Sequence, residues 1–242
     1  MSGEAMMLGI LVFFASVVGT LSGFGASTIM VPVLLLFFPL PVTLLFVGII
    51  HWFGDMWKML FFRGGVWHWR VILWFAIPGV VASFFGASLS VKAPEELLLR
   101  ILGVFLLGYV FFLFLKPEWK LPGNKKTAAL GGFSSGFVAG IFGVGGAIRG
   151  AFLSAFNFPK EVYLFTSGAT ALFIDSTRIV GYVSSGTRLE GLFFWGLFGF
   201  VPLSFLGAWA AKGLVDRIPQ NRFRMVLALF LAAAAVKFLL FP

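Results

Sequence analysis

The sequence contains no cysteine and little charge, and both absences narrow what the protein can do. With no Cys among 242 residues, disulfides, thiolate nucleophiles and cysteine-ligated metals are excluded, while the redox compartment stays open. Charged residues make up 11% of the chain, against about 25% in a soluble domain, so a separate soluble domain is excluded. The two histidines, His51 and His68, do not have a zinc-binding spacing, and no nucleotide-binding loop is present. We therefore expect no enzyme, no cofactor and no metal.

Apolar residues dominate instead. They form 60% of the sequence, and runs of about 20 apolar residues recur along it, which is the pattern of membrane-spanning helices. The net charge of +9 could indicate nucleic acid, but the Lys and Arg residues lie in short loops between apolar runs, as the positive-inside rule describes. The first residues have neither a basic region nor a clear cleavage site, so no removable signal peptide is expected. The expected partner is the lipid bilayer and not nucleic acid.

The sequence repeats itself weakly at a spacing of 120 residues. At this shift Asp55 aligns with Asp175, and Lys58 aligns with Arg178. Glycine and proline positions align as well: Gly23 with Gly143, Gly25 with Gly145, Pro39 with Pro159 and Gly48 with Gly168. Because proline and a carboxylate followed by a cation are rare in apolar segments, their alignment indicates two homologous halves. These are residues 1–116 and 127–242, joined by a polar linker over 117–126.

Each half contains one broken and three unbroken apolar segments. The first half has 5–38 (broken at 23–25), 41–62, 69–91 and 97–115, and the second has 128–157 (broken at 143–146), 160–183, 190–212 and 221–241. As a single helix, 5–38 would be about 50 Å long, which is too long for one membrane span. As two arms of about 15 residues, each arm would reach about 22 Å, which is too short for a full span. We predict two helical hairpins with glycine tips near mid-membrane, in an all-α integral membrane protein.

Loop charges set the predicted topology. If each broken segment is a hairpin, each half crosses the membrane an odd number of times and the second half is inverted. One side then holds Arg63, Arg70, Lys116, Lys120, Lys125, Lys126, Lys160, Lys212, Arg217, Arg222 and Arg224, and the other holds only Lys92, Arg100, Arg188 and Lys237. This imbalance favours two inverted-topology repeats, with the linker on the cytoplasmic side and both termini outside.

The broken segments carry recognisable signatures. GFGASTIMVPVL (23–34) and GVGGAIRGAFL (143–153), with TSGATALFIDSTRIVGYVSSG (166–186), resemble the paired signatures of the sulfite exporter TauE/SafE family, part of the toluene-sulfonate uptake permease group. Some positions depart from that pattern, since Ala26 replaces a third glycine and Phe152 replaces a late proline. In the first half, Val47 and Gly48 stand where the second half has Thr166 and Ser167. The resemblance covers nearly the whole chain. It implies a multi-pass transporter of the prokaryotic inner membrane that carries sulfur oxyanions or organosulfonates.

The glycine tips are candidate anion sites. The second arm of each hairpin begins a helix near Ala26 or Gly146, and a helix N-terminus offers unpaired N–H donors and about half a positive charge. Glycine also lets the backbone approach a ligand closely, and two hydroxyls could add donors at the first tip. The substrate-binding candidates here are Gly25, Ser27, Thr28, Gly145 and Gly146. The alternative is that these small residues only allow tight helix packing.

Among single residues, Arg149 is the strongest candidate for contact with the substrate. It lies about one turn into the second arm of its hairpin, near mid-membrane, where an unpaired charge costs several kcal/mol. Arg can grip a planar oxyanion with two donors. The alternative is a permanent internal salt bridge with Asp55 or Asp175.

Polar residues also line one face of the segment that begins at Lys160. Thr166, Thr170 and Thr177 fall within about 40° of one another, and Ser167 lies about 60–80° further round, so this face could line the substrate path. The alternative is that each hydroxyl bonds back to the carbonyl four residues earlier.

Ionisable residues fall on matching helices of the two halves. Asp55 with Lys58, and Asp175 with Arg178, are i,i+3 pairs that would partly neutralise each other. His51 shares a face with Asp55 and would titrate near neutral pH if unperturbed. Structural pairing is one interpretation. The other is that His51, Asp55, Asp175 and Arg178 couple transport to a proton gradient or act as a gate.

Small residues four apart indicate close helix contacts, within one chain or in a homodimer. The pairs are Gly79 with Ser83, Ala82 with Gly86, and Gly207 with Ala211. Taken together, the sequence predicts a secondary transporter that exports a small sulfur-containing anion held between two helix N-termini. Import of a related anion, or a membrane scaffold that transports nothing, are the alternatives.

Overall fold

Helices form all the regular structure in the parts of the chain that are described. The computed structural model describes residues 3–63, 67–115, 121–214 and 220–241. Its helices are α1 (Gly3–Ser22), α2 (Ser27–Leu34), α3 (Leu40–Phe61), α4 (Trp69–Lys92), α5 (Glu95–Leu115), α6 (Lys125–Phe142), α7 (Gly146–Ser154), α8 (Lys160–Ser184), α9 (Gly191–Trp195), α10 (Leu197–Lys212) and α11 (Gln220–Leu240). Part of the predicted linker, 117–120, lies outside the described residues, and α6 begins inside its last two positions.

Both predicted breaks are present, and glycines in the left-handed conformation make them. Gly23 and Gly25 have φ of 76° and 92°, and Gly143 has φ of 72°, a region that side chains with a Cβ rarely adopt. Gly143 ends α6 in this conformation and donates its N–H to the Ala139 carbonyl at 2.9 Å, the usual glycine stop of a helix.

The two arms of each hairpin are unequal, so the prediction of two arms of about 15 residues is wrong. In the first hairpin α1 has 20 residues and α2 has 8, and in the second α6 has 18 and α7 has 9. At 1.5 Å per residue α1 is about 30 Å long and α2 about 12 Å. The second arms are short because the chain turns again soon after each of them. In the first half it turns before Pro39, and α3 follows that proline directly; in the second half it turns before Pro159, and α8 follows. Because each proline precedes the first helical residue, its missing N–H costs the helix no internal hydrogen bond.

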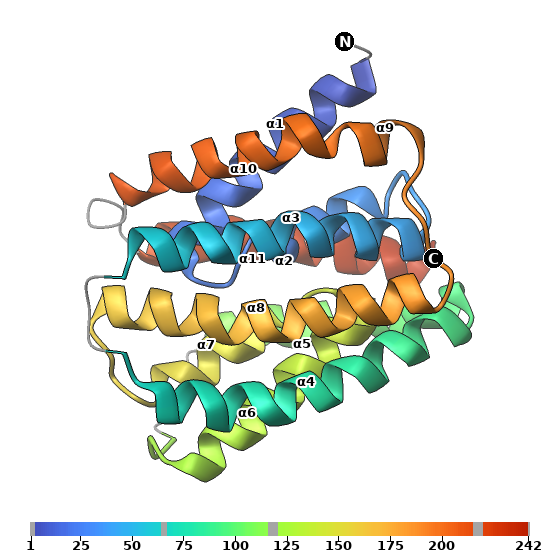
Figure 1. The fold of residues 1–242 in the computed structure, drawn as a ribbon. Coiled ribbons are helices and arrows are strands. Elements are labelled where there is room, and N and C mark those ends of the chain that lie inside the picture. The colour runs from blue at the N-terminus through green and yellow to red at the C-terminus, as the bar shows by residue number, and fades with distance from the viewer. Residues whose placement is uncertain (1–2, 64–66, 116–120, 215–219, 242) are drawn as a thin grey trace.

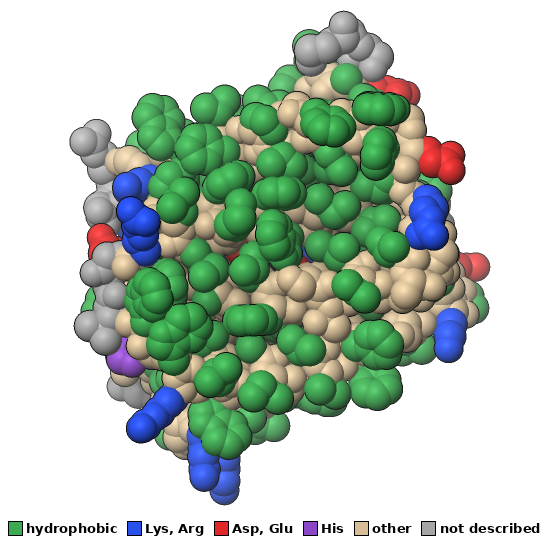
Figure 2. All heavy atoms as spheres, in the orientation of Figure 1, with side chains coloured by type: hydrophobic (Ala, Val, Ile, Leu, Met, Phe, Trp, Pro, Cys, Tyr) green, Lys and Arg blue, Asp and Glu red, His purple; other side chains and the backbone are tan. Residues whose placement is uncertain are grey.

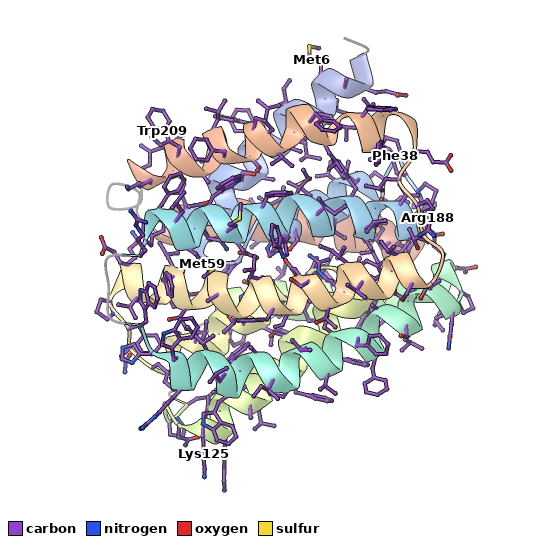
Figure 3. All side chains as sticks on the ribbon, in the orientation of Figure 1. Met6, Phe38, Met59, Lys125, Arg188 and Trp209 are labelled. Atoms are coloured by element: carbon purple, nitrogen blue, oxygen red, sulfur yellow. The ribbon has the colours of Figure 1, made fainter. Side chains whose placement is uncertain are left out.

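The hairpins open toward opposite ends of the molecule. In Figure 1, α1 begins at the upper right and runs inward, and in Figure 3 Phe38, just after α2, lies on the right near Arg188. Lys125, the first residue of α6, lies at the lower left, and α8 begins on the left after α7. The helices pack in pairs, with α3 beside α8 at the centre, α1 on α10, α4 on α6, and α5 on α11.

Three helices among the described residues are long and apolar enough to cross a membrane. These are α1, α3 and α4, and shorter apolar helices occur at Leu197–Lys212 and Leu231–Leu240. Figure 2 shows hydrophobic side chains over the middle of one face, with Lys and Arg gathered at its two ends. Phe198 and Trp195 remain 75% and 69% exposed. Such a belt suits contact with lipid.

Most unbroken segments have the predicted limits. The expectations for 41–62, 69–91, 97–115, 160–183 and 221–241 match α3, α4, α5, α8 and α11 within a few residues. The segment 190–212 was expected to be unbroken, but it is interrupted at Gly196 between α9 and α10. The Phe200 ring packs where a Cβ of Gly196 would lie, and Pro202 removes one helix N–H further along.

Glycines bring helix backbones into direct contact inside the chain. A Cβ at Gly136 of α6 would overlap the Gly79 carbonyl of α4, and one at Gly86 would come within 2.5 Å of the Phe137 carbonyl. On the other side, a Cβ at Gly207 of α10 would lie 2.5 Å from the Phe13 carbonyl of α1. The pairs of small residues four apart therefore serve contacts within one chain, and they give no support to the homodimer.

The contact between α4 and α6 predicts how a substitution at Gly136 changes the stability of the protein. Gly136→Ala should lower the free energy of unfolding by about 1–3 kcal/mol, because the new methyl group meets backbone that cannot rotate away. The control is Gly108→Ala in α5, where nothing lies within 4 Å of an added Cβ; this change should be neutral or stabilising by up to about 1 kcal/mol. Unfolding of the detergent-solubilised variants measures both, and equal stabilities would contradict the glycine contact.

Candidate functional site

The two glycine breaks meet in the interior of the protein. A Cβ at Gly146, the first residue of α7, would overlap the carbonyl oxygen of Phe24, which lies in the first break. Ser167 of α8 donates its hydroxyl to the Gly23 carbonyl at 2.9 Å. The tip of one hairpin therefore lies directly against the tip of the other, and α8 holds the contact. The side-chain hydroxyl of Ser167 satisfies a break carbonyl that has no helical partner.

Arg149 lies at this meeting point with no carboxylate beside it. Its side chain is 1% exposed; Nε donates to Ser167 Oγ at 3.1 Å and Nη2 to the Phe24 carbonyl at 3.5 Å. Among the described residues no Asp or Glu oxygen lies within salt-bridge distance of it. The alternative of a permanent salt bridge with Asp55 or Asp175 is therefore wrong. The guanidinium is held by neutral oxygens and has no ion-pair partner in this part of the chain.

The start of α2 contributes donors to the same place. Ser27 and Thr28 form its first turn and are 1% and 3% exposed, and Thr28 Oγ1 has no partner among the described residues. Neither Ala26 nor Gly145, the residues that precede α2 and α7, provides a side-chain cap. Both helix N-termini therefore present backbone N–H groups without a capping side chain.

The predicted polar face of α8 is divided between two uses. Thr170 bonds back to the Thr166 carbonyl at 2.9 Å, and Thr177 to the Phe173 carbonyl at 3.1 Å, so the alternative interpretation holds for these two. Ser167 instead bridges Arg149 and the first break. Thr166 Oγ1 is buried and unpartnered within the described part of the chain. Ser167 and Thr166 remain the candidates on this helix.

A buried cluster of charges joins α3 and α8. Asp55 pairs with Lys58, and Asp175 Oδ1 accepts from Arg178 Nε at 2.7 Å, so both predicted i,i+3 pairs are confirmed. His51 Nδ1 contacts Asp175 Oδ2 and lies 3.0 Å from Asp55 Oδ2. These side chains are at most 3% exposed. The histidine thus links the carboxylates of the two halves, a contact that sequence spacing did not indicate.

A small cavity lies beside His51. Its volume is about 10 Å³, room for one water-sized group. The lining residues are Ser16, Gly19, Thr20, Gly25, Ala26, His51, Gly54, Asp55 and Lys58. Ser16 Oγ and His51 Nε2 have no partner among the described residues, and a Cβ at Gly25 would overlap His51 Nε2. Gly25 is therefore required both for its left-handed φ and for the space it leaves to the imidazole.

Sequence reasoning missed the contribution of α1 to this cavity. Ser16 and Thr20 are four residues apart, so they lie on one face of the helix, and both are buried, at 3% and 2% exposure. Two hydroxyls at that spacing within an otherwise apolar segment were the available signal.

The charges of the centre favour an anion over a metal. Ligand atoms of His51, Asp55 and Asp175 lie within 4.8 Å of one another, a spacing that a metal ion could use. Both carboxylates, however, already pair with Lys58 and Arg178. Counting Arg149, three buried cations face two buried carboxylates in the described residues. One positive charge is in excess before His51 is considered, and it would repel a divalent cation.

Removing one member of a buried pair should destabilise the protein strongly. Asp55→Asn leaves Lys58, 1% exposed, without its counter-charge, and we expect a loss of about 3–5 kcal/mol in the free energy of unfolding. Replacing both partners, as Asp55→Leu with Lys58→Met, should recover most of that loss.

The exposed pair of Arg100 with Glu96 is the matched control. Its side chains are 51% and 67% exposed, so Glu96→Gln should change stability by less than about 1 kcal/mol. Thermal and denaturant unfolding of the four proteins checks this. Equal effects of Asp55→Asn and Glu96→Gln would show that the buried cluster contributes nothing specific.

Comparison with known protein families gives one match, and it extends over nearly the whole chain. The family described as Sulfite exporter TauE/SafE matches residues 8–238. This range includes both glycine breaks, Arg149 and the buried charge cluster. No individual curated protein matches the chain.

Proposed function

The chain belongs to the sulfite exporter TauE/SafE family, a family of membrane transporters for sulfur anions, and we propose that it is a secondary transporter that exports sulfite or an organosulfonate. The anion binds near mid-membrane, between the N-termini of α2 and α7. Arg149 is its main anchor. No residue takes part in covalent chemistry, and the driving force is an ion gradient or the membrane potential.

The observation that carries this proposal is the surplus of buried donors where the hairpins meet. Arg149 has only neutral oxygens as partners. Thr28 Oγ1, Thr166 Oγ1 and Arg178 Nη1 are buried without any partner in the described residues, and a Cβ at Gly143 would lie 3.3 Å from Arg178 Nη1. Buried donors are nearly always satisfied in a folded protein. An oxyanion held by Arg149 would offset the excess charge, and these donors could bind it as the site opens.

The helix N-termini add to this attraction. Gly145 directly precedes the start of α7, and Gly25 lies two residues before the start of α2. Ser27, Thr28 and Gly146 lie in the first turns of these helices. The partial positive charge of each N-terminus favours an anion. Ser167 positions the Arg149 guanidinium through its 3.1 Å hydrogen bond. Thr170 is bonded to its own helix, so it supports this face of the path without donating to the substrate.

We further propose that residues 1–116 and 127–242 are inverted-topology repeats. The hairpins that open to opposite ends support this. So does the pairing of equivalent helices, since α1 packs on α10 as α6 packs on α4, while α3 packs on α8 and α5 on α11. In such transporters the substrate site lies at the interface of the repeats, where broken helices meet.

The same topology gives an orientation. Arg63, Lys125 and Lys126 are exposed and belong to the cation-rich side, which the positive-inside rule assigns to the cytoplasm. Both termini and Arg188 then lie outside, in the inner membrane of a prokaryote. The linker over 117–126 is cytoplasmic in this orientation.

Transport requires the hairpins to separate. Arg149 is 1% exposed, and the neighbouring cavity of about 10 Å³ admits one water-sized group, whereas sulfite is several times larger. The arrangement described is therefore an occluded state. Movement of one hairpin away from the other would open the site to one side of the membrane at a time.

Substitution of the anchor tests the proposal. In proteoliposomes, the wild type should move labelled sulfite or a short sulfonate, measured in both directions. Arg149→Ala should weaken anion binding by about tenfold to a hundredfold, because it removes charge-assisted hydrogen bonds of about 1.5–3 kcal/mol. The exposed Arg188→Ala, which removes a cation outside the site, should leave binding unchanged.

A thermal-shift series with sulfite, short sulfonates and carboxylates identifies the anion. A ligand that stabilises the wild type and Arg149→Ala equally is not held by Arg149. Absence of flux for every anion in either direction would leave a membrane scaffold as the better interpretation.

A further inference from the structure

The two ring nitrogens of His51 have different surroundings, because one contacts carboxylates and the other has no partner in the described residues. Nδ1 contacts Asp175 Oδ2 and lies 3.0 Å from Asp55 Oδ2. Nε2 has no partner among the described residues, and the ring is one wall of the cavity that Ser16 also lines. With a carboxylate accepting at Nδ1, the neutral ring carries its hydrogen there and presents a free lone pair at Nε2. The basic nitrogen therefore lies against Gly25, one of the residues that line the cavity.

The internal repeat shows that only the first half supplies a histidine to this centre. Under the shift of 120 residues, Asp55 and Lys58 correspond to Asp175 and Arg178, but His51 corresponds to Ala171. Ala171 is fully buried, so the second half packs the same position without an ionisable group. Arg149 is unmatched in the same way, because Ile29 occupies its counterpart position. One half contributes the unmatched anion anchor and the other half contributes the unmatched base.

The cavity provides the means for a proton to arrive. It has room for one water-sized group, and Ser16 Oγ is a buried hydroxyl without a partner in the described chain. A hydroxyl can accept and donate a hydrogen bond at the same time. A hydronium that enters this space when the site opens would transfer its proton to Nε2 and leave a neutral water, which the Ser16 hydroxyl can bind.

We propose that His51 is a proton-binding site linked to the anion site, so that Nε2 takes up a proton when an anion binds at Arg149 and the two cross the membrane together. This inference rests on the proposed function for the identity of the anion. It adds a second, cationic substrate, the proton, and the residue that carries it.

The surrounding charges give the sign of the linkage. Asp55 on α3 and Asp175 on α8 favour the protonated ring, while Lys58 on α3, Arg178 on α8 and Arg149 on α7 oppose it. The elements α1 and the first glycine break contribute only uncharged groups to the cavity. A bound anion offsets the excess positive charge, so it makes protonation easier, and by reciprocity the proton strengthens anion binding. Anion affinity should therefore rise as pH falls through the titration of His51.

The chain allows this titration to be observed directly because it contains only two histidines. In histidine-labelled protein, NMR gives one signal for His51 and one for His68, which is exposed and outside the cluster; His68→Gln assigns them. We expect the His51 signal to titrate, and its midpoint to move to higher pH when sulfite is added. The His68 signal should not respond to sulfite.

Flux provides the second measurement. Sulfite uptake into proteoliposomes is compared for wild type, His51→Gln and the control His68→Gln across the same pH range. Sulfite itself changes charge in this range, but it does so equally for all three proteins. The ratio of their apparent affinities therefore reports only the contribution of the protein to the pH dependence. As pH rises, the affinity of the wild type for sulfite should fall on the order of tenfold relative to that of His51→Gln. His68→Gln should behave as the wild type does.

Several outcomes would overturn the inference. They are a His51 signal that stays in one protonation state throughout, a His51 titration that sulfite does not shift, and a constant ratio between wild type and His51→Gln. Absence of sulfite flux in the wild type would contradict the proposed function. The linkage between His51 and the anion site is tested separately, by whether sulfite shifts the His51 signal. The NMR measurement needs only the wild type and His68→Gln, so it stands if His51→Gln does not fold.

Discussion

The cost of charge in a low-dielectric interior governs the centre of this protein. A charge removed from water must be paired and hydrogen-bonded or it destabilises the fold. Asp55 with Lys58, and Asp175 with Arg178, obey this rule within single helices. Arg149 does not, because its partners are a hydroxyl and a backbone carbonyl. The lack of an ion-pair partner for this cation, at the meeting point of two hairpins, distinguishes Arg149 from the structural ion pairs around it.

The backbone faces a related constraint. A break in a helix exposes N–H and carbonyl groups that lipid cannot satisfy, so both breaks are buried against each other and against α8. Ser167 satisfies one break carbonyl, and the Tyr182 hydroxyl donates to the Gly140 carbonyl at 2.5 Å near the end of α6. The glycines that open these breaks also leave space for His51 and Phe24. Polar backbone and polar side chains therefore gather in one place.

Local features of this centre could be predicted from the sequence, and distant contacts could not. The i,i+3 ion pairs and the breaks at Gly23–Gly25 and Gly143–Gly146 follow from spacing along one helix or one segment. The contact between His51 and Asp175 joins residues 124 apart, and the cavity depends on how α1 meets α3. Spacing alone also could not decide whether Thr170 would face a substrate or its own helix, because both satisfy the hydroxyl. The arm lengths were wrong because they depend on where tertiary packing ends α2 and α7.

The glycine contact between α4 and α6 also limits how the protein can move. A helix interface built from side chains can slide, because rotamers change as the ridges pass one another. At Gly79 and Gly136 backbone meets backbone, so a shift of one helix along the other would drive carbonyl groups into main-chain atoms. These two helices, one from each half, must travel as a single rigid body. Any movement that opens the centre must therefore take place at other contacts than the one between α4 and α6.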